Sequence, residues 1–340
     1  MWCGHLESVD MWQVVGHNRA VRLLQNSIDA NRVSHAYLLS GPRHVGKFTL
    51  AREFAKALNC PEPDRPCGQC RSCRKIDRGV HPDVQAVDLE EGSKNISIDA
   101  VRRLQEGVAL RPAEGRTKVY LLREVERLSE AAANSLLKTL EEPPPSVVMV
   151  LTTLDASTLL PTLVSRCQQI GLRPIPTKEI ETVLRQRFAD SSERSGLLAT
   201  LARGRMGWAL QAASNPSILD SRNELLDRLA ALPAADLVSR FAYAVELATL
   251  HSRDPEAAQG VLETWQSWWR DLLLSRLGLA DMVINVDQKD RLKALSRGYS
   301  IDALSRMVGS IQETISMLAQ NVNARLSLEV LMLSVPRGAR

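Results

Sequence analysis

SHAYLLSGPRHVGKFTLAREFAKAL, residues 34–58, decides the fold class of this chain. His35–Leu39 is a short apolar run of the kind that forms a buried strand, and Phe48–Leu58 places apolar side chains at helical spacing. The loop between them, Gly41–Gly46, leads directly into Lys47. Glycines let the backbone N–H groups of such a loop converge on an anion, the start of the helix adds partial positive charge, and a lysine reaches the outer phosphates. The stretch therefore predicts a phosphate-binding loop, and the alternative is a tight turn that binds no ligand.

Two positions near this loop lack the residues that hold Mg²⁺ in nucleotide hydrolases. A working loop has Ser or Thr directly after the lysine, where this chain has Phe48. Thr49 comes one residue late, and a helix turns by about 100° per residue, so its hydroxyl points elsewhere. The predicted strand 118–122 should end in two acidic residues, but Arg123 takes the first place and Glu124 the second. The chain is therefore predicted to hydrolyse little ATP by itself: Glu124 is vestigial, Mg²⁺ is not expected, and ATP or ADP remains a candidate ligand.

Strands and helices alternate over the first half of the chain. Further strands are predicted at 84–89, 118–122 and 147–152, and further helices at 97–108, 131–141 and 157–164. Strands that alternate with helices imply crossover connections and a parallel sheet covered on both faces. The first half is thus predicted to be an α/β module.

Beyond Pro176 only helical periodicity remains. Helices are predicted at 177–188, 194–201 and 208–213, followed by a helical region over 220–333 with breaks near Pro233, Pro255 and Gly278. Trp265, Trp268 and Trp269 share one helix face, which predicts that they pack in a core or an interface. A small and a larger helical module therefore follow the α/β module.

The composition narrows the class of protein. The 340 residues exceed what one hydrophobic core usually serves, and 44% apolar with 24% charged residues is ordinary for a globular protein. A net charge of +4 permits a nucleic-acid partner without requiring one, and 4% aromatic residues argue against a base-stacking surface as the main binding device. The sequence shows no apolar stretch long enough to span a bilayer and no secretory signal, with Met11 a second candidate for the translation start. We expect a cytoplasmic protein without membrane contact.

Four of the six cysteines are clustered: Cys60, Cys67, Cys70 and Cys73. Two-residue spacers bring thiolates together through tight turns, and four sulfur ligands leave no open position on a tetrahedral Zn²⁺. Such a cluster in a reducing compartment does not favour a disulfide framework. The spacing therefore predicts a structural zinc site over 60–73, with reduced thiols or disulfides as the alternative. Cys3 and Cys167 stand apart from it.

Five strings occur in order along the chain: VVGHNRAV at 14–21, SHAYLLSGPRHVGK at 34–47, AANSLLKTLEEPP at 132–144, LLPTLVSRCQ at 159–168 and NVNARLSLEV at 321–330. Together they resemble the AAA+ clamp-loader subunits of bacterial DNA polymerase III. The absent metal ligands make the chain more similar to the non-motor subunits of that family than to gamma and tau, the motor subunits. Motor subunits also carry a phosphate-sensing arginine in the lid, where Gly207 aligns here and Arg205 is nearby.

The resemblance implies three domains and a set of partners. An AAA+ module would cover 11–170 with the zinc-binding insertion at 60–73, a small helical lid 171–215, and an all-α collar for oligomerisation 216–335. The partners would be the gamma/tau and delta subunits in a hetero-pentameric ring, the sliding clamp, and primer–template DNA through the assembled complex. The chain would help to load the clamp within the DNA polymerase III holoenzyme, without polymerase activity of its own.

The resemblance also assigns roles to single residues. Arg166, between Ser165 and Cys167, is expected in an exposed loop, from which it would enter the ATP site of the neighbouring motor subunit as an arginine finger. The alternative is a surface arginine that pairs with a local carboxylate. Arg102, on the helix 97–108, is the candidate for a contact with DNA phosphates, against a solvated helix face. The residues of the degenerate nucleotide site would be Val15, Gly41, Gly46, Lys47, Phe48 and Thr49.

Two other functions remain open from the sequence. The chain could be a self-sufficient ATPase motor that tolerates Phe48 and Arg123, which would show as ATP turnover by the isolated protein. It could instead be a zinc-dependent nucleic-acid-binding protein that uses the α/β module as a scaffold, which would show as salt-dependent DNA affinity without any partner.

Overall fold

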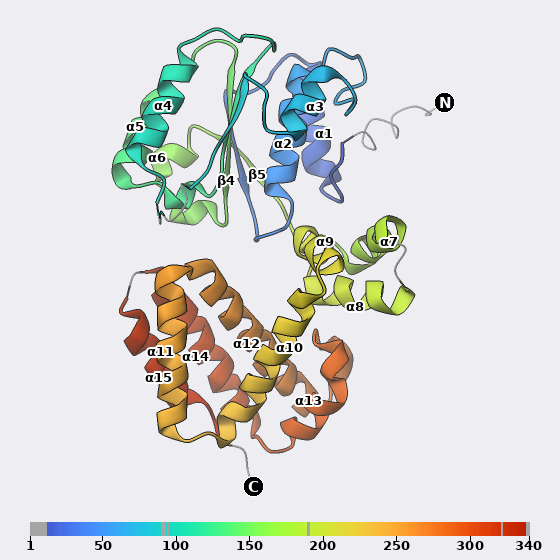
Figure 1. Cartoon of the computed structure of the whole chain (residues 1–340), viewed down its shortest axis with the longest axis vertical. Coiled ribbons are helices and arrows are strands. Elements are labelled where there is room, and N and C mark those ends of the chain that lie inside the picture. Colours follow the sequence, from blue (N-terminus) through green and yellow to red (C-terminus); the bar gives the residue numbers. More distant parts are fainter. Residues whose placement is uncertain (1–11, 90–92, 94, 189–190, 321, 338–340) are drawn as a thin grey trace. The chain divides into compact units, whose positions relative to one another are not determined.

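The computed structural model describes residues 12–89, 93, 95–188, 191–320 and 322–337 (Figure 1). The chain divides into two compact units: Met1–Gln186 with Gly204–Trp208, and Arg187–Arg203 with Ala209–Arg340. The first unit holds a five-stranded sheet, and in the second the described residues form helices and loops. The predicted fold class, an α/β module with a parallel sheet followed by helical modules, is confirmed.

The sheet is parallel throughout, with the strand order β2-β3-β4-β1-β5. The strands are β1 (Ala36–Ser40), β2 (Val84–Val87), β3 (Lys118–Leu122), β4 (Val147–Thr153) and β5 (Gln168–Gly171). The first four were predicted from apolar runs. The prediction missed β5 because it is a short edge strand in which only Ile170 is buried.

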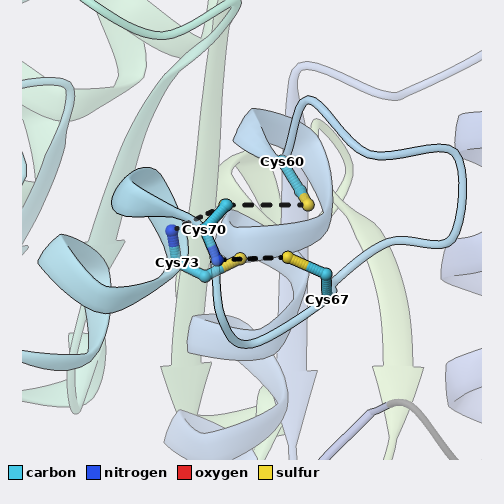
Figure 2. Close-up of side chains that lie close together, drawn as sticks. All are labelled: Cys60, Cys67, Cys70 and Cys73. Atoms are coloured by element: carbon cyan, nitrogen blue, oxygen red, sulfur yellow. Dashed lines mark hydrogen bonds between the residues drawn. The ribbon is translucent and has the colours of Figure 1, made fainter.

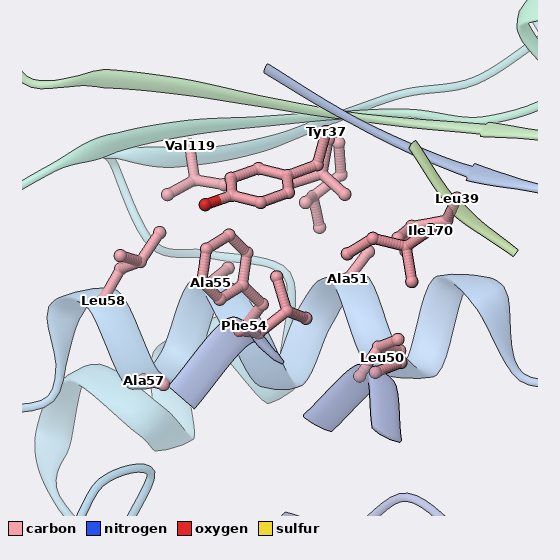
Figure 3. Close-up of a cluster of buried hydrophobic side chains, with 14 of the residues drawn as sticks. Tyr37, Leu39, Leu50, Ala51, Phe54, Ala55, Ala57, Leu58, Val119 and Ile170 are labelled. Atoms are coloured by element: carbon pink, nitrogen blue, oxygen red, sulfur yellow. The ribbon is translucent and has the colours of Figure 1, made fainter. Parts of the chain in front are cut away.

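Helices cover both faces of the sheet. Tyr37 and Leu39 of β1 pack toward α1 (Asn18–Asp29) and α2 (Lys47–Asn59), where the Tyr37 ring meets the Phe54 ring edge-on at 5.0 Å (Figure 3). Leu38, between them, lies in the core on the opposite face, with residues of α4 (Ile98–Val108) and α5 (Glu130–Glu141). Alternate residues of β1 therefore serve two different cores.

The first unit also contains α3 (Arg71–Asp77), α6 (Pro161–Val164), most of α7 (Thr177–Phe188) and the start of α9 (Met206–Ser214). Helix α3 was not among the predicted helices, because seven residues with two buried side chains give little periodicity. The predicted helix 157–164 is a 3-10 turn at Ala156–Thr158 followed by the short α6. Pro161 at the first position of α6 explains the late start, since proline suits the first turn of a helix but not its interior.

The helices that follow α7 are α8 (Ser192–Ala202), α9 (Met206–Ser214), α10 (Ser217–Ala231), α11 (Leu237–Arg253), α12 (Pro255–Arg276), α13 (Lys289–Ser296), α14 (Ile301–Ala319) and α15 (Ala324–Ser334). The predicted breaks at Pro233, Pro255 and Gly278 are confirmed by the ends of these helices. Trp265, Trp268 and Trp269 are 0%, 1% and 1% exposed in the core of the second unit, which confirms the packing prediction. Within the described residues, no helix combines the length and the apolar character that crossing a bilayer would require.

A buried arginine in the second unit connects the ends of two helices by hydrogen bonds. Arg240 on α11 is 3% exposed, and its guanidinium donates hydrogen bonds to the carbonyl oxygens of Leu232, Pro233, Met332 and Val335. Burial lowers the pKa of Arg240, but a guanidinium stays charged. It thereby satisfies carbonyls at the end of α10 and at the end of α15 that would otherwise be buried without partners.

The division into 11–170, 171–215 and 216–335 stays a prediction. The two compact units separate within α7 and again within α9, so their limits do not coincide with the predicted ones. Residue 11, the predicted start of the first module, lies outside the described residues, as does Cys3.

Candidate functional site

The loop after β1 has the backbone geometry of an anion-binding loop. Gly41 and Gly46 have φ of 148° and 114°, and His44 between them has φ of 57°. A Cβ on Gly41 would lie 2.4 Å from the carbonyl oxygen of Leu172, so this position admits only glycine. His17 holds the loop from outside, because its Nε2 lies 2.9 Å from the carbonyl oxygen of Val45.

Lys47 lies folded back on the loop. Its Nζ donates hydrogen bonds to the carbonyl oxygens of Gly41 at 2.5 Å and Pro42 at 2.8 Å. Burial disfavours the ammonium and lowers the pKa of Lys47 to about 8, against the opposing attraction of Glu126 and Glu124. The ammonium thus occupies the inside of the loop, where a phosphate would offer it stronger, charged partners.

The two residues that replace the magnesium ligands contact one another. The guanidinium of Arg123 lies over the Phe48 ring, 4.5 Å from its centroid, and its Nε is 3.3 Å from a carboxylate oxygen of Asp88. A cation held over an aromatic face is attracted by the ring quadrupole. The substitutions of Phe48 and Arg123 therefore form one packed unit beside the loop, and neither side chain offers an oxygen to a metal ion.

The other residues predicted for the nucleotide site are Val15, Thr49 and Glu124, which lie on the segments next to the loop. Val15 is half-buried in the segment before α1, and Thr49 is half-buried in the first turn of α2. Glu124 has a left-handed backbone with φ of 50°, and its carboxylate lies 3.1 Å from Arg127 Nε. In the structure Lys47 thus donates a hydrogen bond to Gly41, and Arg123 stacks on Phe48. Burial lowers the pKa of Lys47, and the negative charge of Glu124 opposes this shift by favouring the charged form.

Sequence reasoning missed three residues of this site. Glu126 has the largest electrostatic influence on Lys47, and one of its carboxylate oxygens accepts the N–H of Leu154 while the other is enclosed without a hydrogen-bond partner. His17 and Asp88 were missed because their roles depend on the turns that follow. The one available signal was the position of Asp88 near the end of the predicted strand 84–89, since the carboxyl ends of parallel strands meet at one edge of the sheet.

The four clustered cysteines converge where α2 ends and α3 begins (Figure 2). Cys60 follows the last residue of α2, and Cys70 is the N-cap of α3. The four Sγ atoms lie within 4.8 Å of one another, and those of Cys60 and Cys70 are 3.9 Å apart. A regular tetrahedron with Zn–S bonds of about 2.3 Å places its sulfurs about 3.8 Å apart. The four thiols thus fit a single zinc ion.

Backbone hydrogen bonds prepare these thiols for a metal. The N–H of Cys70 donates to Cys67 Sγ at 3.3 Å, and the N–H of Cys73 donates to Cys70 Sγ at 3.4 Å. Burial raises the pKa of Cys67, but N–H donors, including those of Gln69 and Cys70, lower it to about 7. Burial raises the pKa of Cys60 and Cys73, so a metal cation is what would hold these two as thiolates.

Arg166 follows α6, as expected for a loop residue, and its side chain is 33% exposed. Its guanidinium lies 2.6 Å from a carboxylate oxygen of Glu141, at the end of α5, and donates to the carbonyl oxygen of Thr162 at 2.8 Å. The isolated chain therefore shows the local ion pair, and the role of Arg166 in a neighbouring subunit stays a prediction. Its neighbour Cys167 is buried, which raises the pKa of that thiol to about 12.

Arg102 lies on the solvent side of α4. Its guanidinium is 3.3 Å from the carboxylate of Asp99, one turn earlier, and both side chains are well exposed. An exposed pair of this kind contributes little to stability, so the arginine is free to exchange its partner for a phosphate. The DNA contact stays a prediction.

Two family models match the chain. One, described as "DNA polymerase III, delta subunit", matches residues 16–176, and the other, its "C terminal" counterpart, matches residues 216–336. The delta' subunit of DNA polymerase III from Bacillus subtilis is 29% identical over 321 residues, which cover 94% of this chain and 96% of that protein.

The tau subunits are similar over part of their length. That of Escherichia coli is 40% identical over 204 residues, which cover 58% of this chain and 31% of tau. The chain spans between 24% and 60% of the length of the four tau or tau/gamma relatives. Among solved structures, a gamma subunit-related protein of DNA polymerase III from Thermotoga maritima is 20% identical with a TM-score of 0.48, covering 92% of this chain and 99% of that one.

The cysteine cluster generates a prediction about metal content. The purified chain should carry about one zinc ion, and Cys73→Ser should reduce that content to near zero with a lower melting temperature, because the remaining thiols cannot close the tetrahedron. Cys167→Ser is the matched control, since it removes a buried cysteine outside the cluster and should leave the zinc content unchanged. Atomic absorption and thermal melts provide the measurements. Equal zinc in the Cys73→Ser and Cys167→Ser variants would show that the cluster is not the site.

The buried position of Lys47 generates a prediction about pH. A lowered pKa means that the folded chain loses this charge as the pH rises through about 8, whereas an ordinary lysine keeps it to about 10.5. NMR titration with ¹³C-labelled lysine should show the Lys47 midpoint near 8 and its loss in Lys47→Met. Lys56 is the internal control: burial opposes its charge, but hydrogen bonds from its ammonium to Glu53 and Asp77 raise its pKa. Midpoints above 10 for both lysines would contradict the prediction.

Proposed function

Since the chain belongs to the delta subunit family of DNA polymerase III, we propose that it is a clamp-loader subunit of the delta' type that does not hydrolyse ATP itself. Its two matched regions, 16–176 and 216–336, correspond to the α/β module and the helical region after α9, and its likeness to the Bacillus subtilis delta' subunit extends over both. In this role it would join gamma/tau and delta subunits in a ring and help to load the sliding clamp on primed DNA.

The contact between Phe48 and Arg123 is the main support for the proposal that the chain does not hydrolyse ATP. ATP hydrolysis in phosphate-loop enzymes needs Mg²⁺ held by a hydroxyl after the lysine and by a carboxylate at the end of the neighbouring strand. Here an aromatic ring and a guanidinium stand in these two positions and pack on each other. Restoring a metal would require displacing a cation that is also paired with Asp88. ATP or ADP remains a candidate ligand, held by the loop and Lys47 without magnesium.

Arg166 would supply the chemistry that the chain lacks to an adjacent ATP site. It follows a short helix on the surface, and among the described residues its guanidinium contacts an exposed carboxylate and a carbonyl oxygen. Exposed ion pairs contribute about 0–1 kcal/mol, so an interface that offers a triphosphate outcompetes Glu141 with little cost. A guanidinium presented across an interface stabilises the charge of the transferring phosphoryl group. In this proposal Arg166 pairs with Glu141 in the isolated chain and exchanges that partner for the triphosphate of a neighbouring subunit on assembly.

The cysteine cluster and the helical region would provide structural support. A zinc ion bound by Cys60, Cys67, Cys70 and Cys73 would leave no open coordination position, which suits folding of the insertion rather than catalysis. In the helical region, α11 and α15 pack against each other and expose apolar side chains of Val238, Val245, Leu326, Val330 and Leu333. Such an exposed apolar set favours burial against other subunits, as the predicted collar over 216–335 requires.

The absence of hydrolysis is tested on the isolated protein. We expect phosphate release from Mg-ATP to stay at the level of the Lys47→Ala variant, because neither metal ligand is present. Comparison with Lys47→Ala separates true turnover from a contaminating ATPase. Brisk turnover by the wild-type chain that disappears in Lys47→Ala would favour an active motor instead.

The arginine finger is tested in a clamp loader reconstituted with the gamma/tau and delta subunits of the same organism. Arg166→Ala should lower phosphate release at the one ATP site that it faces by about 10³-fold or more, seen as loss of one fast phase in single-turnover measurements with primed DNA. Glu141→Gln is the matched control, since it breaks the local ion pair and keeps the guanidinium. It should retain the fast phase. If Arg166→Ala leaves the ATPase unchanged, or Glu141→Gln reproduces the loss, Arg166 has no role in trans.

A further inference from the structure

A polar cavity lies in the first unit, away from the phosphate loop. Its volume is about 730 Å³, and its walls come from the end of α1, the cysteine loop, and the turns before β3 and β4. These turns lead into the amino ends of adjacent strands, whereas the phosphate loop follows the carboxyl end of β1. The five residues of β1 span about 17 Å at about 3.3 Å per residue, so the two sites are separate.

Two nitrogen atoms in this cavity are enclosed without hydrogen-bond partners. They are Nε2 of His35, just before β1, and Nε of Arg65, in the cysteine loop. An enclosed polar group without a partner costs free energy comparable to a lost hydrogen bond, and a guanidinium nitrogen can only donate. Both atoms belong to residues that line the same cavity.

The charge of the cavity matches a negatively charged ligand. Arg116 joins Arg65 and His35 in the wall, and the N–H of Arg116 is anchored to Asn59 Oδ1 at 2.9 Å. Among the described residues that line the cavity, Asp29 is the one carboxylate, and the Gln25 amide donates to both of its oxygens. The basic groups therefore outnumber the acidic one, and a planar guanidinium fits the oxygens of a phosphate in a bidentate manner.

The remaining residues of the wall are compatible with a ligand larger than an inorganic phosphate ion. Leu58, Val33 and Val148 contribute apolar surface, and cavities of about 300–1,000 Å³ hold small organic ligands. We propose that this cavity is a binding site for a phosphate group, with Arg65, Arg116 and His35 as its ligands. The phosphate would belong either to a free nucleotide or to the backbone of a nucleic acid. This proposal is independent of the clamp-loader role and of the phosphate loop.

Binding is tested on the zinc-loaded full chain that carries Lys47→Ala, which silences the phosphate loop. Inorganic phosphate, ADP and a 20-nucleotide oligothymidine are titrated by calorimetry, and the ¹⁵N resonance of His35 Nε2 reports on the cavity directly. We expect saturable binding of a probe with a shift of that resonance, weakened about tenfold or more by Arg65→Gln through loss of a charged hydrogen bond. Arg32→Gln, an exposed arginine next to the cavity that does not line it, should change the affinity by less than about twofold.

The probes also distinguish the source of the phosphate. Binding of phosphate and ADP with dependence on Arg65 identifies a free nucleotide, whereas binding of the oligonucleotide alone with the same dependence identifies a nucleic-acid backbone. If Arg65→Gln loses zinc or structure, Arg116→Gln replaces it, because Arg116 lies outside the cysteine loop. The proposal is wrong if no probe binds, if the His35 resonance does not respond, or if Arg32→Gln weakens binding as much as the cavity variants.

Discussion

Burial of strand β1 on both faces is the constraint on which the rest of the first unit depends. Tyr37 and Leu39 pack into one core and Leu38 into the other, so a shift of one residue would exchange the two sets and disrupt both cores. The ends of the strand are therefore held in place. Its carboxyl end positions the phosphate loop against Leu172, and its amino end positions His35 in the wall of the cavity that Arg65 and Arg116 also line. Both candidate ligand sites thus depend on the packing of one five-residue strand.

The phosphate loop keeps positive charge but supplies it from the protein instead of from a metal. Arg123 is attached to a strand end, stacked on Phe48 and paired with Asp88, and Lys47 rests on the loop carbonyls. Magnesium enters and leaves with each nucleotide, whereas a tethered guanidinium remains. On the proposed function, a site built in this way would not pass through cycles of metal binding and release. That constancy would suit a subunit that responds to ATP in its neighbours rather than to its own.

Local patterns sufficed to predict the buried strands, the phosphate loop and the cysteine cluster, because each of them is encoded within about fifteen consecutive residues or fewer. The sequence also singled out Phe48 and Arg123, whose place at former metal positions stays a prediction. It did not predict that Phe48 and Arg123 contact each other, because they are 75 residues apart in the chain and meet only through the order of the strands. Glu126 was overlooked for a similar reason, since its influence on Lys47 depends on the left-handed turn at Glu124. The pairing of Arg166 with Glu141 likewise joins the turn after α6 to the end of α5, two segments that the sequence leaves unconnected.

Helix α2 connects two features that look independent in the sequence. Its first residue is Lys47, and Cys60 follows its last, so a rod of 13 residues runs from the phosphate loop to the cysteine cluster. Its middle is buried, with Phe54, Ala55 and Ala57 fully enclosed, which leaves the rod little freedom to bend. Oxidation of the thiols would therefore not remain a local lesion. It would displace the end of α2 at Asn59, and a helix that does not bend would transmit this displacement to Lys47 at its start.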